Sequence, residues 1–284
     1  MIVLNNLTYR YRKGAEALTD VSASIGPGIH LLLGENGAGK TTLLHVMAGL
    51  LYPSSGECLI DGEDTSRRMP SELSRVFFLG DNMPFPAKTI NEMARIHAVF
   101  YPGFDAVQLQ ENLTSFGLTG DEPIAKMSLG NRHKSQVAYA LALKTDILLL
   151  DEPANGLDIS AKQALQSMIA SNVNEEQTVI ISTHTVNDFT NLFDGVIVLS
   201  RSHLLIAMTA NDIVSRITFT VSSIPAIDPV YGETRINMFH SIVENTDGED
   251  SDIDYILLYN ALMNPSSRPR LLQLLNNNDN EQHD

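Results

Sequence analysis

Residues 34–41, with the sequence GENGAGKT, constrain this chain more than any other segment does. They match the phosphate-binding pattern G-x-x-x-x-G-K-[ST]. An apolar run over residues 29–33 precedes the loop, and a helix is expected over residues 40–50. A strand, a glycine-rich loop and a helix in this order surround an anion with backbone N–H groups and the positive end of the helix. A glycine-rich turn with an unrelated lysine is the simpler alternative, and the strand and helix on either side argue against it.

The loop also predicts which residues bind the nucleotide. We expect Lys40 to reach the β- and γ-phosphates and the Thr41 hydroxyl to hold Mg²⁺. The residues expected to form the cradle for ATP are Gly34, Glu35, Asn36, Gly37, Ala38, Gly39, Lys40, Thr41 and Thr42.

An acidic composition restricts the partners. The 284 residues include 34 acidic and 19 basic ones, a formal charge of 19 − 34 = −15. Such a surface repels phosphate backbones and anionic lipid, so we expect no nucleic acid partner. The single cysteine, Cys58, excludes an internal disulfide framework. We see neither a secretory signal nor an apolar run of membrane-spanning length. One cysteine fits a reducing cytoplasm. If this protein serves a membrane, we expect it to do so through a partner.

Residues 1–33 are expected to form short strands broken by turns. Strands and helices alternate over residues 146–199, which predicts a mostly parallel sheet covered by helices. Residues 80–127 are expected to form a helical subdomain. The remaining residues, 211–284, carry 12 acidic and 4 basic side chains, a net −8, and are expected to form a small α+β extension. Its expected strands are residues 217–221, 234–243 and 253–259. The low-complexity end, residues 276–284, is expected to be disordered.

Two adjacent acids follow an apolar strand over residues 147–150. Asp151, at the end of this strand, is placed to hold Mg²⁺, and Glu152 is placed to polarise an attacking water. Solvated acids at a strand end are the favoured alternative for this segment alone. The phosphate loop in the same chain makes the catalytic interpretation the stronger one.

With these motifs in order, residues 1–210 resemble the nucleotide-binding subunits of ABC transporters. The resemblance implies that Ser128 and Gly130 belong to a signature segment that binds the γ-phosphate of ATP held by the opposite subunit. It also implies that Asp158 belongs to a loop crossing the dimer interface. His184 would hydrogen-bond the γ-phosphate, and Tyr11, which precedes the phosphate loop, would stack on adenine. The alternatives are helix capping by Ser128 and Asp158, a structural histidine and a surface tyrosine.

The chain departs from the pattern of this family at several positions. Leu129 replaces a signature glycine, and Asn131 replaces the signature glutamine. Gly80 falls where the family usually has a glutamine, with Asp81 or Asn82 as possible substitutes, and we predict altered coupling or slower hydrolysis. The segment 82–88 is expected to dock the transmembrane partner through exposed Met83 and Phe85, unless these side chains pack internally.

The resemblance implies a fold, a function and a set of partners. The fold is α/β, an ABC-type phosphate-loop ATPase with a mostly parallel core sheet and an antiparallel β edge. The function is ATP binding and hydrolysis, with Mg²⁺, that powers a membrane transporter. Export is favoured, because the helical region and the S-x-G signature look most like bacterial exporter-type cassettes. The expected partners are a separate transmembrane permease and a second ATP-binding subunit, identical or related, in a dimer that encloses two ATP molecules. The resemblance also implies a cytoplasmic location, peripheral on the inner face of the cell membrane through the permease. Glu152, His184 and Lys40 are the expected catalytic residues. The alternative is a soluble ABC ATPase that serves as an assembly scaffold or a regulatory ATP switch.

Overall fold

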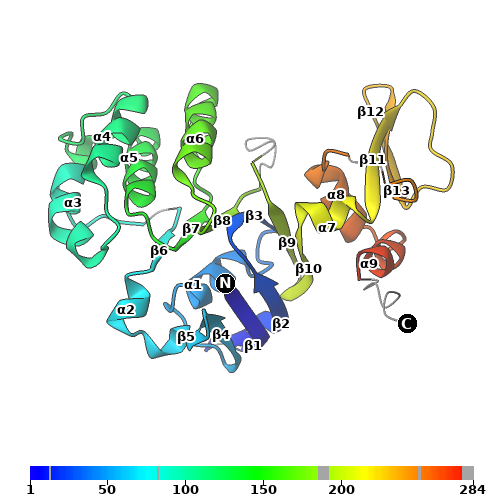
Figure 1. Ribbon diagram of the computed structural model, residues 1–284, viewed down its shortest axis with the longest axis horizontal. Helices are drawn as coiled ribbons and strands as arrows, with labels where there is room; N and C mark the ends of the chain where they lie inside the picture. Colours follow the sequence, from blue (N-terminus) through cyan, green and yellow to red (C-terminus); the bar gives the residue numbers. More distant parts are fainter. Residues whose placement is uncertain (13, 82, 185–191, 249–250, 277–284) are drawn as a thin grey trace.

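The computed structural model describes residues 1–12, 14–81, 83–184, 192–248 and 251–276. A group of helices lies at one end of the long axis, the two largest sheets lie in the middle, and a C-terminal group lies at the other end (Figure 1). Over the described ranges, no helix is long and apolar enough to cross a membrane.

The core is a six-stranded sheet in the order β10–β9–β3–β8–β7–β6. All neighbouring pairs are parallel except β9 with β10. β7, β8 and β9 are buried along their whole length, as parallel strands covered on both faces require. Mostly parallel pairing therefore agrees with the expected fold. The strands are β3 (Gly28–Leu33), β6 (Val76–Leu79), β7 (Ile147–Asp151), β8 (Thr178–Ser182), β9 (Gly195–Ser200) and β10 (His203–Thr209).

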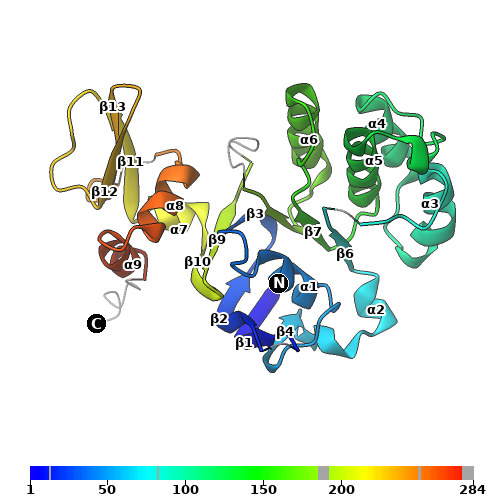
Figure 2. The same cartoon turned by 180° about the vertical axis from the view of Figure 1, so that it is seen from behind.

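A four-stranded antiparallel sheet in the order β2–β1–β4–β5 forms the predicted β edge. Helix α1 (Lys40–Met47) lies between this sheet and the core sheet (Figure 2). Alternating apolar residues of the antiparallel strands pack against α1, so one hydrophobic cluster fixes the helix that follows the phosphate loop. The strands are β1 (Ile2–Arg10), β2 (Glu16–Ile25), β4 (Ser55–Ile60) and β5 (Glu63–Asp64).

The other helices that precede the C-terminal group begin at capping side chains where the sequence supplies them. Thr89, Asp105, Ser128 and Asp158 each accept a hydrogen bond from a backbone N–H of the first turn. These helices are α2 (Pro70–Leu73), α3 (Ile90–His97), α4 (Ala106–Ser115), α5 (Leu129–Ala142) and α6 (Ile159–Asn172), with 3₁₀ turns at Thr65–Arg67, Ala98–Phe100 and Ile124–Lys126.

The C-terminal group contains a three-stranded antiparallel sheet in the order β11–β13–β12, with helices beside it. Helix α8 packs on the core because the Tyr255 hydroxyl donates to the Phe193 carbonyl (3.1 Å) and their rings meet edge to face. The elements are α7 (Ala210–Val214), β11 (Ile217–Ser222), β12 (Tyr231–Arg235), β13 (Met238–Glu244), α8 (Tyr255–Met263) and α9 (Arg268–Asn276).

Two sequence predictions fail in this group. The expected strand over residues 253–259 is the helix α8, because Asp254 caps it by accepting from Leu257 N (2.8 Å), and short apolar runs suit either structure. The expected strand over 234–243 is two strands, because Ile236 and Asn237 have positive φ and turn the chain. The predicted disordered end, residues 276–284, begins at Asn276, which is the last residue of α9, and the other residues of that prediction, 277–284, lie outside the described residues.

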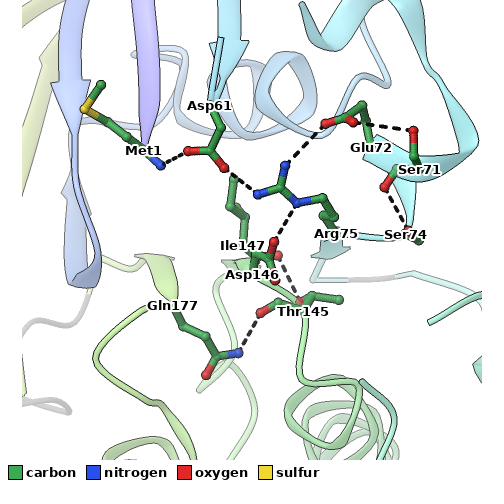
Figure 3. A network of polar contacts seen from close by, with 10 residues as sticks. All are labelled: Met1, Asp61, Ser71, Glu72, Ser74, Arg75, Thr145, Asp146, Ile147 and Gln177. Atoms are coloured by element: carbon green, nitrogen blue, oxygen red, sulfur yellow. Dashed lines mark hydrogen bonds and ion pairs between the residues drawn. The ribbon is translucent and has the colours of Figure 1, made fainter. Parts of the chain in front are cut away.

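Arg75, just before β6, joins the two larger sheets (Figure 3). Its Nε donates to Asp146 (2.5 Å), just before β7, and its Nη2 donates to Asp61, which follows β4. Glu72 of α2 lies 3.6 Å from Nη1. The hydrogen bond to Asp146 raises the pKa of Arg75 most, and the hydrogen bond to Asp61 raises it next most. Both carboxylates therefore stabilise the charged form of the guanidinium group.

We expect Arg75→Ala to lower the free energy of unfolding by about 1–2 kcal/mol, because the bonded carboxylates are partly exposed and solvent screens them. Urea denaturation at neutral pH measures this change. The control is Arg67→Ala, which removes a pair to Glu63 (3.7 Å) whose two side chains are 68% and 57% exposed. Equal losses for the two variants would show that Arg75 does not join the sheets.

Candidate functional site

The phosphate loop lies between β3 and α1 at the carboxyl edge of the core sheet. Gly39 has φ +107°, and a Cβ there would lie 2.3 Å from the Ala17 carbonyl oxygen. A Cβ on Gly34 would lie 2.6 Å from the Leu199 carbonyl oxygen. Only glycine fits either position, so neighbouring strands force the loop to be glycine-rich. Of the predicted cradle, Gly34 and Ala38 do not line the cavity above the loop, and Ala38 is buried.

Lys40 is buried in the first turn of α1 and folds back over the loop. Its Nζ donates to the carbonyls of Gly34 (2.7 Å) and Glu35 (3.4 Å). Burial lowers its pKa, and the charges of Glu152 and Asp151 oppose this effect. The ammonium group therefore lies within the field of both carboxylates.

The buried Asp151 carboxylate is held on both oxygens. Thr41 Oγ1 donates to Oδ2 (2.7 Å), and the Ser182 hydroxyl donates to Oδ1. The second bond follows from strand register, because Asp151 of β7 lies opposite Ser182 of β8. The pairing brings together the predicted metal-holding residues Thr41 and Asp151, which lie far apart in the sequence.

Glu152 and His184 form the next pair along this edge. His184 Nδ1 lies 2.8 Å from Glu152 Oε2, and the backbone N–H of Glu152 donates to the Ser182 carbonyl (3.0 Å). Glu152 has φ +52°, a left-handed conformation uncommon for a non-glycine residue. The Glu152 side chain is 19% exposed and that of His184 is 60% exposed. The carboxylate therefore faces the site while the ring shields it from solvent on one side.

A cavity of about 450 Å³ opens above the loop. Tyr11 is 45% exposed at its rim, and its hydroxyl lies 3.0 Å from Thr42 Oγ1. The ring of Tyr9 meets that of Tyr11 edge to face, with centroids 4.9 Å apart. The lining residues are Tyr11, Ala17, Glu35, Asn36, Gly37, Gly39, Lys40, Thr41, Thr42, Asp81, Asp151 and Glu152.

Two residues that line the cavity were not among the nucleotide-binding residues predicted from the sequence. Ala17 of β2 borders the loop at Gly39, and no pattern in its own segment marks it. Asp81 follows β6, whose neighbour in the sheet is β7. The carboxyl ends of parallel strands lie together at one edge of the sheet. A polar residue just after such a strand is therefore expected at the edge where the nucleotide site lies. Of the two suggested substitutes for glutamine, Asp81 lines the cavity and Asn82 lies outside the described residues.

Ser128, Gly130 and Asp158 do not line the cavity of their own chain. Ser128 Oγ accepts from Asn131 N (3.2 Å) and caps α5, while Asp158 Oδ1 accepts from Ala161 N (2.8 Å) and caps α6. A Cβ on Gly130 would lie 3.1 Å from the Gly156 carbonyl oxygen, so the two segments are adjacent. Ser128 and Asp158 are exposed.

The predicted docking segment differs from expectation at its apolar residues. Phe85 is 8% exposed, and its ring meets that of Tyr139 edge to face with centroids 5.5 Å apart. Met83 is half-buried on the core, and its carbonyl accepts from Gln136 Nε2 (2.7 Å). The expectation of an exposed Phe85 is therefore wrong. The aromatic side chains of the helical group provide a better environment for this ring than water does.

Comparison with known proteins identifies the family. A family model described as ABC transporter matches residues 18–155. The ABC transporter ATP-binding protein NatA of Bacillus subtilis (strain 168) is 33% identical over 218 residues, which cover 72% of this chain and 88% of NatA.

Two solved structures extend the comparison. The dimeric ATP-binding cassette MJ0796, in a post-hydrolysis state bound to ADP and Pi, is 25% identical with a TM-score of 0.62, covering 74% of this chain and 98% of that one. The putative cobalt transport ATP-binding protein cbiO-2 is 21% identical with a TM-score of 0.65, covering 91% and 100%, and it shows the fold alone. Since a curated relative is matched over most of its length and the fold agrees, this chain belongs to the ATP-binding subunits of ABC transporters, a family of ATPases.

Proposed function

We propose that this chain hydrolyses ATP in the cavity above the phosphate loop and thereby drives a membrane transporter. The observation that carries the proposal is the hydrogen-bonded series Thr41–Asp151–Ser182 beside Glu152–His184, at the edge where Lys40 also lies. Phosphoryl transfer depends on positioning and on stabilising charge, and these groups supply both.

The residues at this edge and at the rim of the cavity have separate roles in the proposal. Lys40 exchanges its backbone carbonyl partners for the β- and γ-phosphates. Thr41 and Asp151 offer a hydroxyl and a carboxylate side by side, which are the oxygen ligands that Mg²⁺ prefers. The ion, when bound, neutralises charge on the phosphates. Tyr11, exposed at the rim, provides a flat surface for adenine.

Glu152 acts as the general base. Its carboxylate accepts a proton from water as the water oxygen bonds to the γ-phosphorus and the bond to ADP breaks. His184, whose Nδ1 lies 2.8 Å from Glu152 Oε2, holds the carboxylate in place, and in our proposal it also hydrogen-bonds the γ-phosphate. A base within hydrogen-bond reach of its proton contributes about 10²–10⁴ in rate.

Two such subunits, identical or related, enclose two ATP molecules in our proposal. Ser128, Gly130 and Asp158 support this arrangement because they are absent from the cavity of their own chain and therefore remain for the opposite one. The relative MJ0796 is described as dimeric with ADP and Pi bound. Residues 1–210 would form the ATP-binding domain and residues 211–284 its extension.

The membrane partner in our proposal is a separate permease. The segment 82–88 would dock it, with the subunit on the inner face of the cell membrane. Export is the direction we propose, because the helical segment and its S-x-G signature resemble exporter-type cassettes.

Mixing two inactive variants tests the shared site. Lys40→Met removes the phosphate contact from each chain, and Ser128→Arg blocks each signature. Neither variant alone is expected to hydrolyse ATP. In a mixed dimer one site combines the intact Lys40 of one chain with the intact Ser128 of the other, and the second site carries both substitutions. Random pairing makes about half of the dimers mixed, so a one-to-one mixture is expected to recover about a quarter of the wild-type rate. No recovery on mixing would show that each site lies within one chain.

A further inference from the structure

Carboxylates outnumber cations among the described residues that line the cavity above the phosphate loop. Glu35, Asp81, Asp151 and Glu152 all line it, whereas Lys40 is the single cation among the described lining residues. Both ligands of this cavity, ATP and its magnesium complex, are anionic. The surplus of carboxylates therefore acts against the charge that the site must bind.

Asp81 is the member of this set that lies outside the two sequence motifs. It also borders a second, smaller cavity together with Asp151 and Glu152, so the three carboxylates are neighbours at the ends of β6 and β7. The core sheet thus brings a third acidic side chain to the edge that receives the triphosphate.

The position of Asp81 is fixed by the turn that follows Glu152. Asn155 Nδ2 donates to Asp81 Oδ1 (2.8 Å). The Asn155 backbone N–H donates to the Glu152 carbonyl (3.0 Å), and its own carbonyl lies 2.7 Å from His133 Nδ1 of α5. Because Asn155 is held at both backbone groups, Asp81 is held at the cavity and is not a loose side chain pointing to solvent.

We infer that Asp81 makes this site select the magnesium complex of ATP against metal-free ATP. Bound Mg²⁺ cancels two negative charges of the triphosphate, so repulsion by a nearby carboxylate acts mainly on the metal-free form. Asp81 is a specificity-determining residue in this inference, which rests on the proposed nucleotide site. Lys40, Thr41 and Asp151 then bind the complex that Asp81 admits.

The test is equilibrium binding of a non-hydrolysable ATP analogue, measured once with excess Mg²⁺ and once with EDTA. We expect Asp81→Asn to raise the affinity for the metal-free analogue about 3- to 10-fold and to change the affinity for the magnesium complex less than about 2-fold. The substitution keeps an acceptor oxygen for Asn155, so the turn is preserved. Asp81→Ala serves as the second variant, with the same expected direction.

Asp121→Asn is the matched control, because Asp121 accepts from Asn91 Nδ2 (2.9 Å) in the helical group and does not line the cavity. It should leave both affinities at wild-type values. An unchanged ratio in both Asp81 variants would overturn the inference. A loss of affinity for the magnesium complex alone would also overturn it, because Asp81 would then hold the metal. Wild-type protein that binds neither form would instead refute the nucleotide site itself.

Discussion

Glu152→Gln lowers the rate of ATP hydrolysis by about 10²–10⁴-fold and leaves ATP bound. The amide has the shape of the carboxylate but accepts no proton from water, so the loss equals the contribution of a general base. The nitrogen or oxygen of the amide still reaches His184, which lies 2.8 Å from Oε2 in the wild type. The phosphate loop and Lys40 are untouched, so binding of ATP persists and the closed dimer accumulates.

Phosphate release measures the rate, and size-exclusion chromatography with Mg·ATP measures the dimer. Glu111→Gln is the control, since Glu111 lies on α4 and does not line the cavity, and its carboxylate accepts from Gln108 Nε2 (3.3 Å). It should match wild type in both measurements. A wild-type turnover rate in Glu152→Gln would remove Glu152 from the role of base.

Lys40→Met weakens ATP binding by about 10- to 100-fold, as expected for the loss of a hydrogen bond to a charged group. The substitution keeps the length of the side chain and removes the one cation among the described lining residues. Asp151 and Glu152, whose charges act on Lys40, then face the triphosphate without it. Both effects reduce affinity for the nucleotide.

Lys144→Met is the matched control for this variant. Lys144 Nζ also donates to a backbone carbonyl, that of Asn172 (3.2 Å), and lies away from the cavity. Titration calorimetry with a non-hydrolysable ATP analogue compares the two. If Lys40→Met bound the analogue as tightly as Lys144→Met does, the phosphates would not lie at Lys40.

Much of the site could be predicted because its residues lie next to strand ends. The phosphate loop follows β3, the acids 151–152 end β7, and His184 follows β8. Parallel pairing delivers these ends to one edge, so short contiguous motifs suffice to name them. Ala17 could not be named, because it meets the loop only through the packing of β2 on Gly39.

Two predictions from the sequence were wrong because tertiary contacts decide the structure of the residues concerned. Residues 253–259 are apolar enough for either secondary structure, and the cap by Asp254 with burial of Tyr255 on the core decides for a helix. The sequence predicts an exposed Phe85 because prolines flank it, but the ring of Tyr139 from α5 packs against its ring. In both cases a contact with a distant part of the sequence contributes to the outcome.

We propose above that this ATPase drives a transporter through a membrane partner. Affinity capture of tagged Glu152→Gln from solubilised native membranes, with Mg·ATP, followed by mass spectrometry, tests it most directly. Tagged Lys40→Met, which we expect to bind ATP weakly, is processed in parallel. We expect a stoichiometric protein with several membrane spans, enriched with Glu152→Gln over Lys40→Met. Recovery of only soluble proteins, or of the chain alone, would contradict it.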